Sequence, residues 1–145
     1  MKVAIGADHG GFELKEKIVA YLKEKSIDYT DYGTYDMTSC DYNDAALKVT
    51  TAVSEKQAER GILICGTGIG MSIQANKVKG IRAALVHDLF TAKATRLHND
   101  TNVLAMGGRI IGDEIAKAIV DVWLHTEFSN EERHRRRVEK LEKND

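Results

Sequence analysis

The sequence predicts an α/β fold in which helices cover both faces of a five-stranded parallel sheet. Short strand-like runs and helix-like segments alternate from one end of the chain to the other. Consecutive β-α units of this kind form a parallel sheet with the connecting helices on its faces. At 145 residues the chain is too short for two ordinary domains, so we expect one domain over residues 1–145.

Three strands and three helices are expected in the first half of the chain. Short apolar or β-branched runs predict strands at residues 2–6, 27–32 and 61–65. Apolar residues three and four positions apart predict helices at residues 12–25, 45–57 and 71–78. Residues 33–43 are polar and irregular in pattern, so we expect a loop there.

The second half continues the alternation. Strands are expected at residues 81–86 and 103–106, and helices at residues 88–97, where Asp88 can cap the first turn, and at 112–128. In the last of these helices the inward residues should be Ile115, Ile119, Val120, Trp123 and Leu124. Residues 130–145 are strongly charged, with Val138 and Leu141 as apolar anchors, so we interpret them as a helix on the surface, at a subunit interface or beside the site.

Composition excludes several classes of function. A net charge of −1 argues against a general binder of nucleic acid or of membrane surfaces. No apolar run approaches the ~20 residues of a membrane helix, and the N-terminus enters a strand-like run without a signal-peptide pattern. Two cysteines, Cys40 and Cys65, make neither a disulfide framework nor a metal set, so a reducing cytoplasm is the expected location.

The segment 61–70, GILICGTGIG, holds the most informative pattern. Cys65 ends a buried strand, and a glycine-rich turn follows it and opens a helix, whose free amides favour negative charge. A free cysteine is often only a small buried hydrophobe. The position between an apolar strand and a glycine turn favours the alternative, a thiolate that acts as base or nucleophile.

The glycine turn differs from a dinucleotide-binding fingerprint. Its spacing is G-x-G-x-G, it follows the third strand, and it lacks a Walker lysine, although Asp88 lies at a tempting distance beyond the next strand. Glycines let successive backbone N–H groups approach a ligand oxygen. We therefore interpret the turn as a cradle for an anion.

Other polar residues gather where the predicted strands end, the usual ligand-binding edge of such sheets. These groups are residues 7–9, 65–70, 87–88 and 107–109. His98 and Asn99 are expected in a loop before the fifth strand, and loops often carry functional residues. His9, in the loop after the first strand, is a candidate for the same reason. His87 and His125 are interpreted as structural.

Arg133 and Arg137 stand four residues apart, on one face of the expected C-terminal helix. They form either a solvated basic face balanced by neighbouring glutamates or a clamp for a phosphate. We expect the thiol, the cradle, the histidine and the arginines to fall on one edge of the sheet or to reach it.

With these residues assembled, the chain resembles the B-type ribose-5-phosphate isomerases and their sugar-phosphate isomerase relatives, including galactose-6-phosphate isomerase subunits. The resemblance covers nearly the whole length. It rests on the motifs at residues 8–11, 64–70, 75–77, 98–104 and 108–109 and on Arg133, His134 and Arg137.

The resemblance implies a Rossmann-like three-layer α/β/α domain that works as a homodimer or homotetramer with sites between subunits. Cys65 then resembles the base that moves a proton between two carbons, with Thr67 beside it, and His98 resembles the group that opens the sugar ring. The enediolate cradle would comprise Gly66, Thr67, Gly68, Ile69 and Gly70. Asp8 and Asn99 would hold hydroxyls, and the phosphate end would be lined by His9, Arg109, Arg133 and Arg137. Neither metal nor cofactor is implied.

The expected function is the reversible isomerisation of ribose 5-phosphate and ribulose 5-phosphate, in the pentose phosphate pathway. Asn43 and Ala45 depart from the proline and aromatic residue common in the family, which leaves open a hexose 6-phosphate substrate such as allose or galactose 6-phosphate. A non-catalytic nucleotide- or phosphate-binding protein is the more distant alternative.

Overall fold

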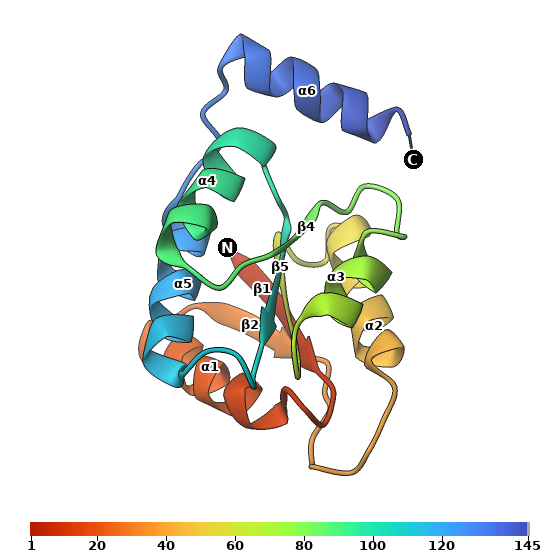
Figure 1. Ribbon diagram of the computed structural model, residues 1–145, viewed down its shortest axis with the longest axis vertical. Coiled ribbons are helices and arrows are strands. Elements are labelled where there is room, and N and C mark those ends of the chain that lie inside the picture. The colour runs from red at the N-terminus through yellow and green to blue at the C-terminus, as the bar shows by residue number, and fades with distance from the viewer. Residues whose placement is uncertain (145) are drawn as a thin grey trace.

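The computed structural model describes residues 1–144 and has the predicted α/β architecture (Figure 1). One sheet contains five strands, all parallel, in the order β2-β1-β3-β5-β4. The strands are β1 (Lys2–Ala7), β2 (Asp28–Asp31), β3 (Arg60–Cys65), β4 (Ala83–Leu85) and β5 (Val103–Gly107). We call the edge where the strands begin the amino edge, and the edge where they end the carboxyl edge.

Helices form a layer on each side of this sheet. They are α1 (Phe12–Glu24), α2 (Tyr42–Ser54), α3 (Ile69–Ala75), α4 (Leu89–Asn99), α5 (Asp113–His125) and α6 (Glu132–Glu142). The core on one face contains residues of α1, α4 and α5, and the core on the other contains residues of α2 and α3. Figure 1 shows α6 apart from both layers, beyond the amino edge and next to α4.

The central strand β3 shows how the sequence builds the two cores. Successive side chains of a strand point to opposite faces. Ile62 and Ile64 accordingly enter the core with α1 and α5, whereas Leu63 and Cys65 enter the core with α2 and α3. A strand buried on both faces reads as the uninterrupted apolar run seen in the sequence.

Several element boundaries differ from the prediction. α2 begins at Tyr42 and α3 at Ile69, both earlier than expected, while β4 is shorter than expected and ends at Leu85. The prediction that Ile115 faces inward is wrong, because its exposed fraction is 49%. The buried residues of α5 start at Ala116, and Ile115 lies in the first turn at the margin of that stripe.

The charged C-terminal segment is a helix, but its expected anchors bury little. Leu141 is half exposed, Val138 is partly buried, and the buried side chain of α6 is His134. Residue 145 of the expected segment lies outside the described residues. Among residues 1–144 no helix is long and apolar enough to cross a membrane.

The strand order fixes where a ligand can bind. From β1 the chain goes to β2 on one side and, after α2, to β3 on the other. The connections therefore diverge between β1 and β3, and a crevice opens at the carboxyl edge of such a switch point. The loops after β1 and β3 lie at this switch point, so the sheet places Asp8 and Cys65 next to each other.

Two glycines that precede helices test the packing at this point. A methyl group on Gly11, before α1, would overlap the carbonyl of Ile64, whereas one on Gly112, before α5, would meet no atom within 4 Å. Because overpacking costs about 1–3 kcal/mol, we expect Gly11→Ala to lower the free energy of unfolding by that amount. The matched control Gly112→Ala should change it by less than about 1 kcal/mol in either direction. Urea unfolding of both variants measures this, and equal effects would contradict it.

Candidate active site

Cys65 stands at the carboxyl edge as the last residue of β3, with 6% of its surface exposed. Its Sγ accepts a hydrogen bond from the backbone N–H of Gly68 at 3.0 Å. Gly68 has a φ of +78°, a left-handed conformation that glycine adopts at little cost. This conformation directs the Gly68 amide at the sulfur atom.

The loop after β1 packs directly on the Cys65 loop. The backbone N–H of Asp8 donates to the carbonyl of Ile64 at 3.2 Å. Asp8 Oδ1 accepts the amides of Gly10 and Gly11 at 2.9 and 3.1 Å, which fixes the carboxylate in place. A methyl group on Gly10 would lie 3.0 Å from the backbone nitrogen of Gly66, so the two backbones approach closely.

The turn after β5 holds the Cys65 loop from the other side. The amide of Gly108 donates to the carbonyl of Cys65 at 2.8 Å, and the amide of Arg109 donates to that of Gly66 at 3.0 Å. The guanidinium of Arg109 lies over Gly66, where an added methyl group would be 3.0 Å from Nη1. Arg109 therefore belongs to the same edge as Cys65, Asp8 and the glycine turn.

The glycine turn itself carries one hydroxyl. Thr67 is exposed, and its Oγ1 accepts the amide of Ile69 at 3.3 Å. Gly70 packs against the ring of Tyr42, which an added methyl group would approach to 2.7 Å. The sequence pattern does not predict this contact of Tyr42, because it indicates a loop there, whereas Tyr42 opens α2 and packs against α3.

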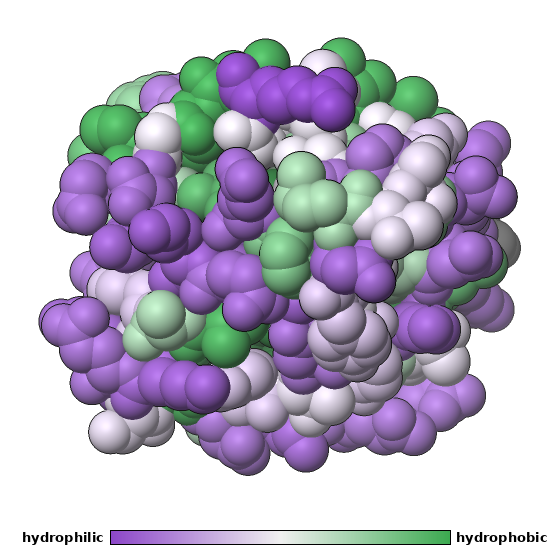
Figure 2. All heavy atoms as spheres, turned by 90° about the horizontal axis from the view of Figure 1, so that it is seen from below, coloured by the Kyte–Doolittle hydropathy of each residue, from purple (hydrophilic) through white to green (hydrophobic). Residues whose placement is uncertain are grey.

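His9 also lies at the carboxyl edge, where its Nδ1 accepts the amide of Cys40 at 3.2 Å. This contact ties the loop between β2 and α2 to the loop after β1. Exposed apolar side chains border the same edge on the side of β4. These are Ile69, Ile73, Leu85, Leu89 and Phe90, of which Phe90 is 80% exposed. Figure 2 views the molecule from this end and shows hydrophobic side chains gathered toward its upper margin.

His98 and Asn99 lie at the opposite edge of the sheet. They end α4, which begins after β4 and returns the chain to the start of β5. The ring of His98 contacts that of His134 on α6, with centroids 4.7 Å apart. His134 is buried, its Nδ1 bonds Ser129 Oγ at 2.6 Å, and burial lowers its pKa, assisted by the positive charges near it. His98 itself is exposed.

The two arginines share this amino edge with His98. Arg133 and Arg137 are exposed on α6, and Arg133 Nε pairs with Glu131 at 3.0 Å. In a single chain, then, the expected site residues do not fall on one edge. The five residues of β5 alone span roughly 13 Å between the two edges, since a strand rises about 3.3 Å per residue.

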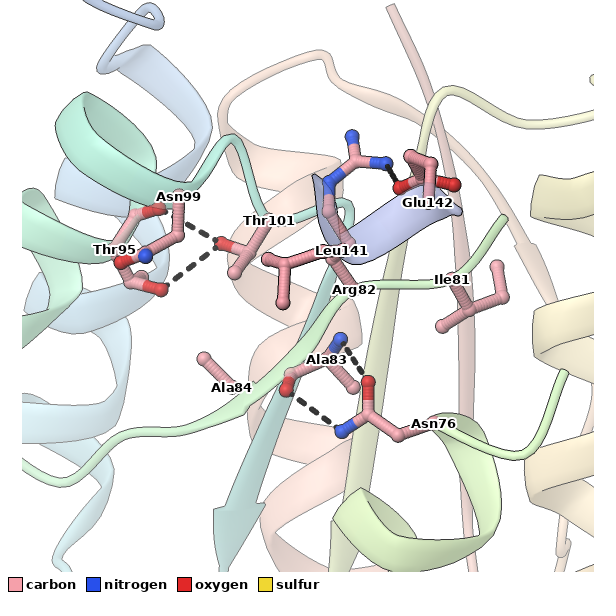
Figure 3. A pocket seen from close by; sticks show the side chains of 10 residues that line it. All are labelled: Asn76, Ile81, Arg82, Ala83, Ala84, Thr95, Asn99, Thr101, Leu141 and Glu142. Carbon is pink, nitrogen blue, oxygen red and sulfur yellow. Dashed lines mark hydrogen bonds and ion pairs between the residues drawn. The ribbon is translucent and has the colours of Figure 1, made fainter. Parts of the chain in front are cut away.

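A pocket of about 400 Å³ opens at the amino edge between α4, β4 and α6 (Figure 3). Arg82 lines it and forms ion pairs with Glu142 of α6 and, at 3.3 Å, with Asp100. Asp100 also pairs with the buried Arg96 at 2.8 Å. These charges connect the end of α6 to the strand and helix beside Asn99, which also lines the pocket.

The carboxyl edge therefore joins a thiol, a glycine turn, a carboxylate, a histidine and an arginine, whereas the amino edge joins a histidine pair, an amide and two exposed arginines. The first set can move a proton and bind an anion. Within residues 1–144, no group of three or more His, Cys, Asp or Glu side chains is arranged as a metal site.

Known proteins resemble this chain over nearly its whole length. A family model described as ribose/galactose isomerase matches residues 3–141. The chain is 54% identical to a Bacillus subtilis protein provisionally named as a sugar phosphate isomerase, over 97% of this chain and 95% of the relative. It is 48% identical to ribose-5-phosphate isomerase B of Escherichia coli, over 97% of this chain and 93% of that one.

A third relative carries a different name. The chain is 47% identical to a D-erythrulose-4-phosphate isomerase of Pectobacterium atrosepticum, over 88% of this chain and 85% of that one. Among solved structures, ribose-5-phosphate isomerase B of Clostridium thermocellum superposes with a TM-score of 0.97 at 48% identity, over 99% of this chain and 97% of that one. These matches confirm the resemblance inferred from the motifs. The chain therefore belongs to the ribose/galactose isomerase family.

Proposed function

We propose that the chain catalyses the reversible isomerisation of ribose 5-phosphate and ribulose 5-phosphate through an enediolate. The observation that carries the proposal is the buried thiol of Cys65, which accepts the Gly68 amide at 3.0 Å beside the glycine turn. Isomerisation requires a base next to a carbonyl and donors aimed at the oxyanion that develops. The family membership and the ribose-5-phosphate isomerases among its relatives support the same reaction.

In this mechanism Cys65 acts as the base. Its thiolate removes the proton from C2 of the open-chain aldose, and the negative charge moves to O1. Backbone amides of the glycine turn other than those of Gly68 and Ile69, which already donate within the turn, stabilise the enediolate. The exposed hydroxyl of Thr67 lies where it can bond O1 or O2. The hydroxyl proton passes from O2 to O1, and the Cys65 thiol returns its proton to C1, which yields the ketose.

The remaining groups serve the substrate outside the reacting carbons. Asp8 is held by the Gly10 and Gly11 amides, so its second carboxylate oxygen can accept a sugar hydroxyl. Arg109 and His9 stand at the phosphate end of the carboxyl edge. Ring opening moves a proton from the O1 hydroxyl to the ring oxygen, and we assign this step to His98.

His98 can perform that step only if a second copy supplies it. His98, Asn99, Arg133 and Arg137 lie at the amino edge, roughly 13 Å or more from Cys65 along the strands. We infer that the amino edge of one copy faces the carboxyl edge of another, in a homodimer or a homotetramer. The exposed apolar side chains beside β4 extend from the carboxyl edge toward this contact.

The first measurement is the preference of the enzyme among sugar phosphates. We expect kcat/KM for ribose 5-phosphate to exceed that for allose 6-phosphate by about 10- to 200-fold, the discrimination usual for one extra carbon unit. Erythrose 4-phosphate should be assayed alongside them, because one relative is named as an isomerase of the four-carbon sugar D-erythrulose 4-phosphate. A higher value for the hexose phosphate would make the chain a hexose 6-phosphate isomerase. Tight nucleotide binding without turnover of any sugar phosphate would overturn the proposal.

Replacing the base tests the mechanism. Because loss of a general base usually costs 10² to 10⁴-fold, we expect Cys65→Ala to lower kcat for ribose 5-phosphate by about that factor. Cys40→Ala is the matched control, since it removes the other free thiol and should retain kcat within about threefold of the parent. If Cys65→Ala turned over as fast as the parent, Cys65 would not be the base.

Mixing two inactive variants tests the shared site. In a symmetric dimer of Cys65→Ala and His98→Ala chains, one site combines both changes and the other contains neither. Random exchange of subunits should therefore restore roughly a quarter of the parental activity. Cys65→Ala mixed with Asp8→Ala is the control, because both changes lie at the carboxyl edge and every site stays defective. Equal activity of the two mixtures would place the complete site within one chain.

A further inference from the structure

Gly107 ends β5, and β4 stops before it can provide a backbone acceptor for the Gly107 amide. β4 pairs with β5 in a register that places Leu85 opposite Ala105, so residue 87 would be the partner of Gly107. β4 ends at Leu85, two residues too early. The side chain of His87 takes up the contact instead, because its Nε2 accepts the Gly107 amide at 2.9 Å. Gly107 is buried, so without His87 its amide would have no water molecule to bond in place of this acceptor.

The next two amides of the same turn hold the loop of the thiol. Gly108 and Arg109 donate to the carbonyls of Cys65 and Gly66. Three consecutive amides are thus fixed, the first by His87 and the other two by the Cys65 loop. The backbones also touch, because a methyl group on Gly107 would lie 2.8 Å from the Cα of Thr67, and one on Gly68 would lie 2.8 Å from the carbonyl carbon of Met106.

We propose that His87 is a positioning residue for this reaction, one that aligns the Cys65 thiol and the glycine turn by holding the 107–109 turn against them. It acts through Gly107 and does not touch the substrate. A displacement of Gly107 moves Thr67 and Gly68 with it, since no space separates them, and Gly68 donates the hydrogen bond to the sulfur. The kinetic part of the proposal rests on the proposed isomerase function.

The charge state of His87 suits an acceptor. Nε2 can accept the Gly107 amide only when it carries no proton, and burial lowers the pKa of His87, which favours the neutral ring. Asp88 opposes this effect. The Asp88 carboxylate accepts the amide and the hydroxyl of Thr91, both at 2.7 Å, so it caps α4 and is occupied there.

Two substitutions of His87 distinguish the effect of losing its hydrogen bond from the effect of losing its ring. Glutamine places an amide oxygen about as far from the backbone as Nε2, so His87→Gln keeps an acceptor, whereas His87→Leu fills similar space and removes it. We expect His87→Leu to lower kcat for ribose 5-phosphate by about 10- to 100-fold with KM within about threefold, because small misplacements of reacting groups can cost 10²-fold. His87→Gln should keep kcat within about fivefold of the parent. His125→Leu is the control for removing an exposed histidine.

A second readout does not depend on the sugar. The rate at which iodoacetamide alkylates Cys65, followed by peptide mass spectrometry across pH, reports the reactivity of that thiol in its local environment. We expect the profile of His87→Leu, where the Gly68 amide shifts away from the sulfur, to differ from that of the parent, and the profile of His87→Gln to match it. Thermal unfolding identifies a variant that does not fold. If His87→Leu does not fold, His87→Asn replaces it, because the shorter side chain of asparagine keeps its amide oxygen out of reach of the Gly107 amide.

The outcomes distinguish the two proposals. An unchanged kcat and an unchanged alkylation profile in His87→Leu would overturn the role of His87. Equal losses of kcat in His87→Leu and His87→Gln would also overturn it, because they would mean that the ring and not the hydrogen bond matters. If the parent isomerised no sugar phosphate, the proposed function would fail, while the alkylation profiles would still decide whether His87 aligns the thiol.

Discussion

The close approach of three backbones at the carboxyl edge is the constraint on which the site depends. The loops after β1, β3 and β5 exchange amides and carbonyls directly, with Asp8 donating to Ile64 and Gly108 to Cys65. Side chains would prevent this, since a methyl group on Gly108 would lie 2.9 Å from the carbonyl oxygen of Gly10. Glycines at these positions therefore do more than permit turns. They bring the three loops close enough to hold the Cys65 loop in place, where the Gly68 amide points at the sulfur atom.

The half of the site at this edge could be predicted from the sequence because its signals are local. A buried strand, a cysteine and a glycine turn are contiguous, and the ends of parallel strands converge by topology. The position of His98 follows an equally simple rule that our sequence interpretation did not apply. A helix that connects two parallel strands returns the chain to the edge where the strands begin, so a loop before a strand lies far from the loops after strands.

Other features depend on boundaries that a pattern does not fix. Tyr42 reaches Gly70 because α2 begins three residues earlier than the apolar pattern indicates. His87 reaches Gly107 because β4 stops early and leaves an amide unpaired. In both cases the contact depends on where the element begins or ends, and a sequence taken one segment at a time does not fix that boundary.

The amino edge is held together by different forces from the carboxyl edge. α6 buries His134 and little else, and its far end is attached to the sheet by the ion pair between Arg82 and Glu142. Partly exposed ion pairs contribute little stability, so α6 gains little from its own chain. Its exposed arginines gain more from a dianionic phosphate, which their planar forks match. On the proposed function, substrate and a second copy together would add the contacts that α6 lacks within its own chain. In the proposed assembly, a thiol on one edge and a histidine on the other would serve one reaction without any large movement of the sheet that separates them.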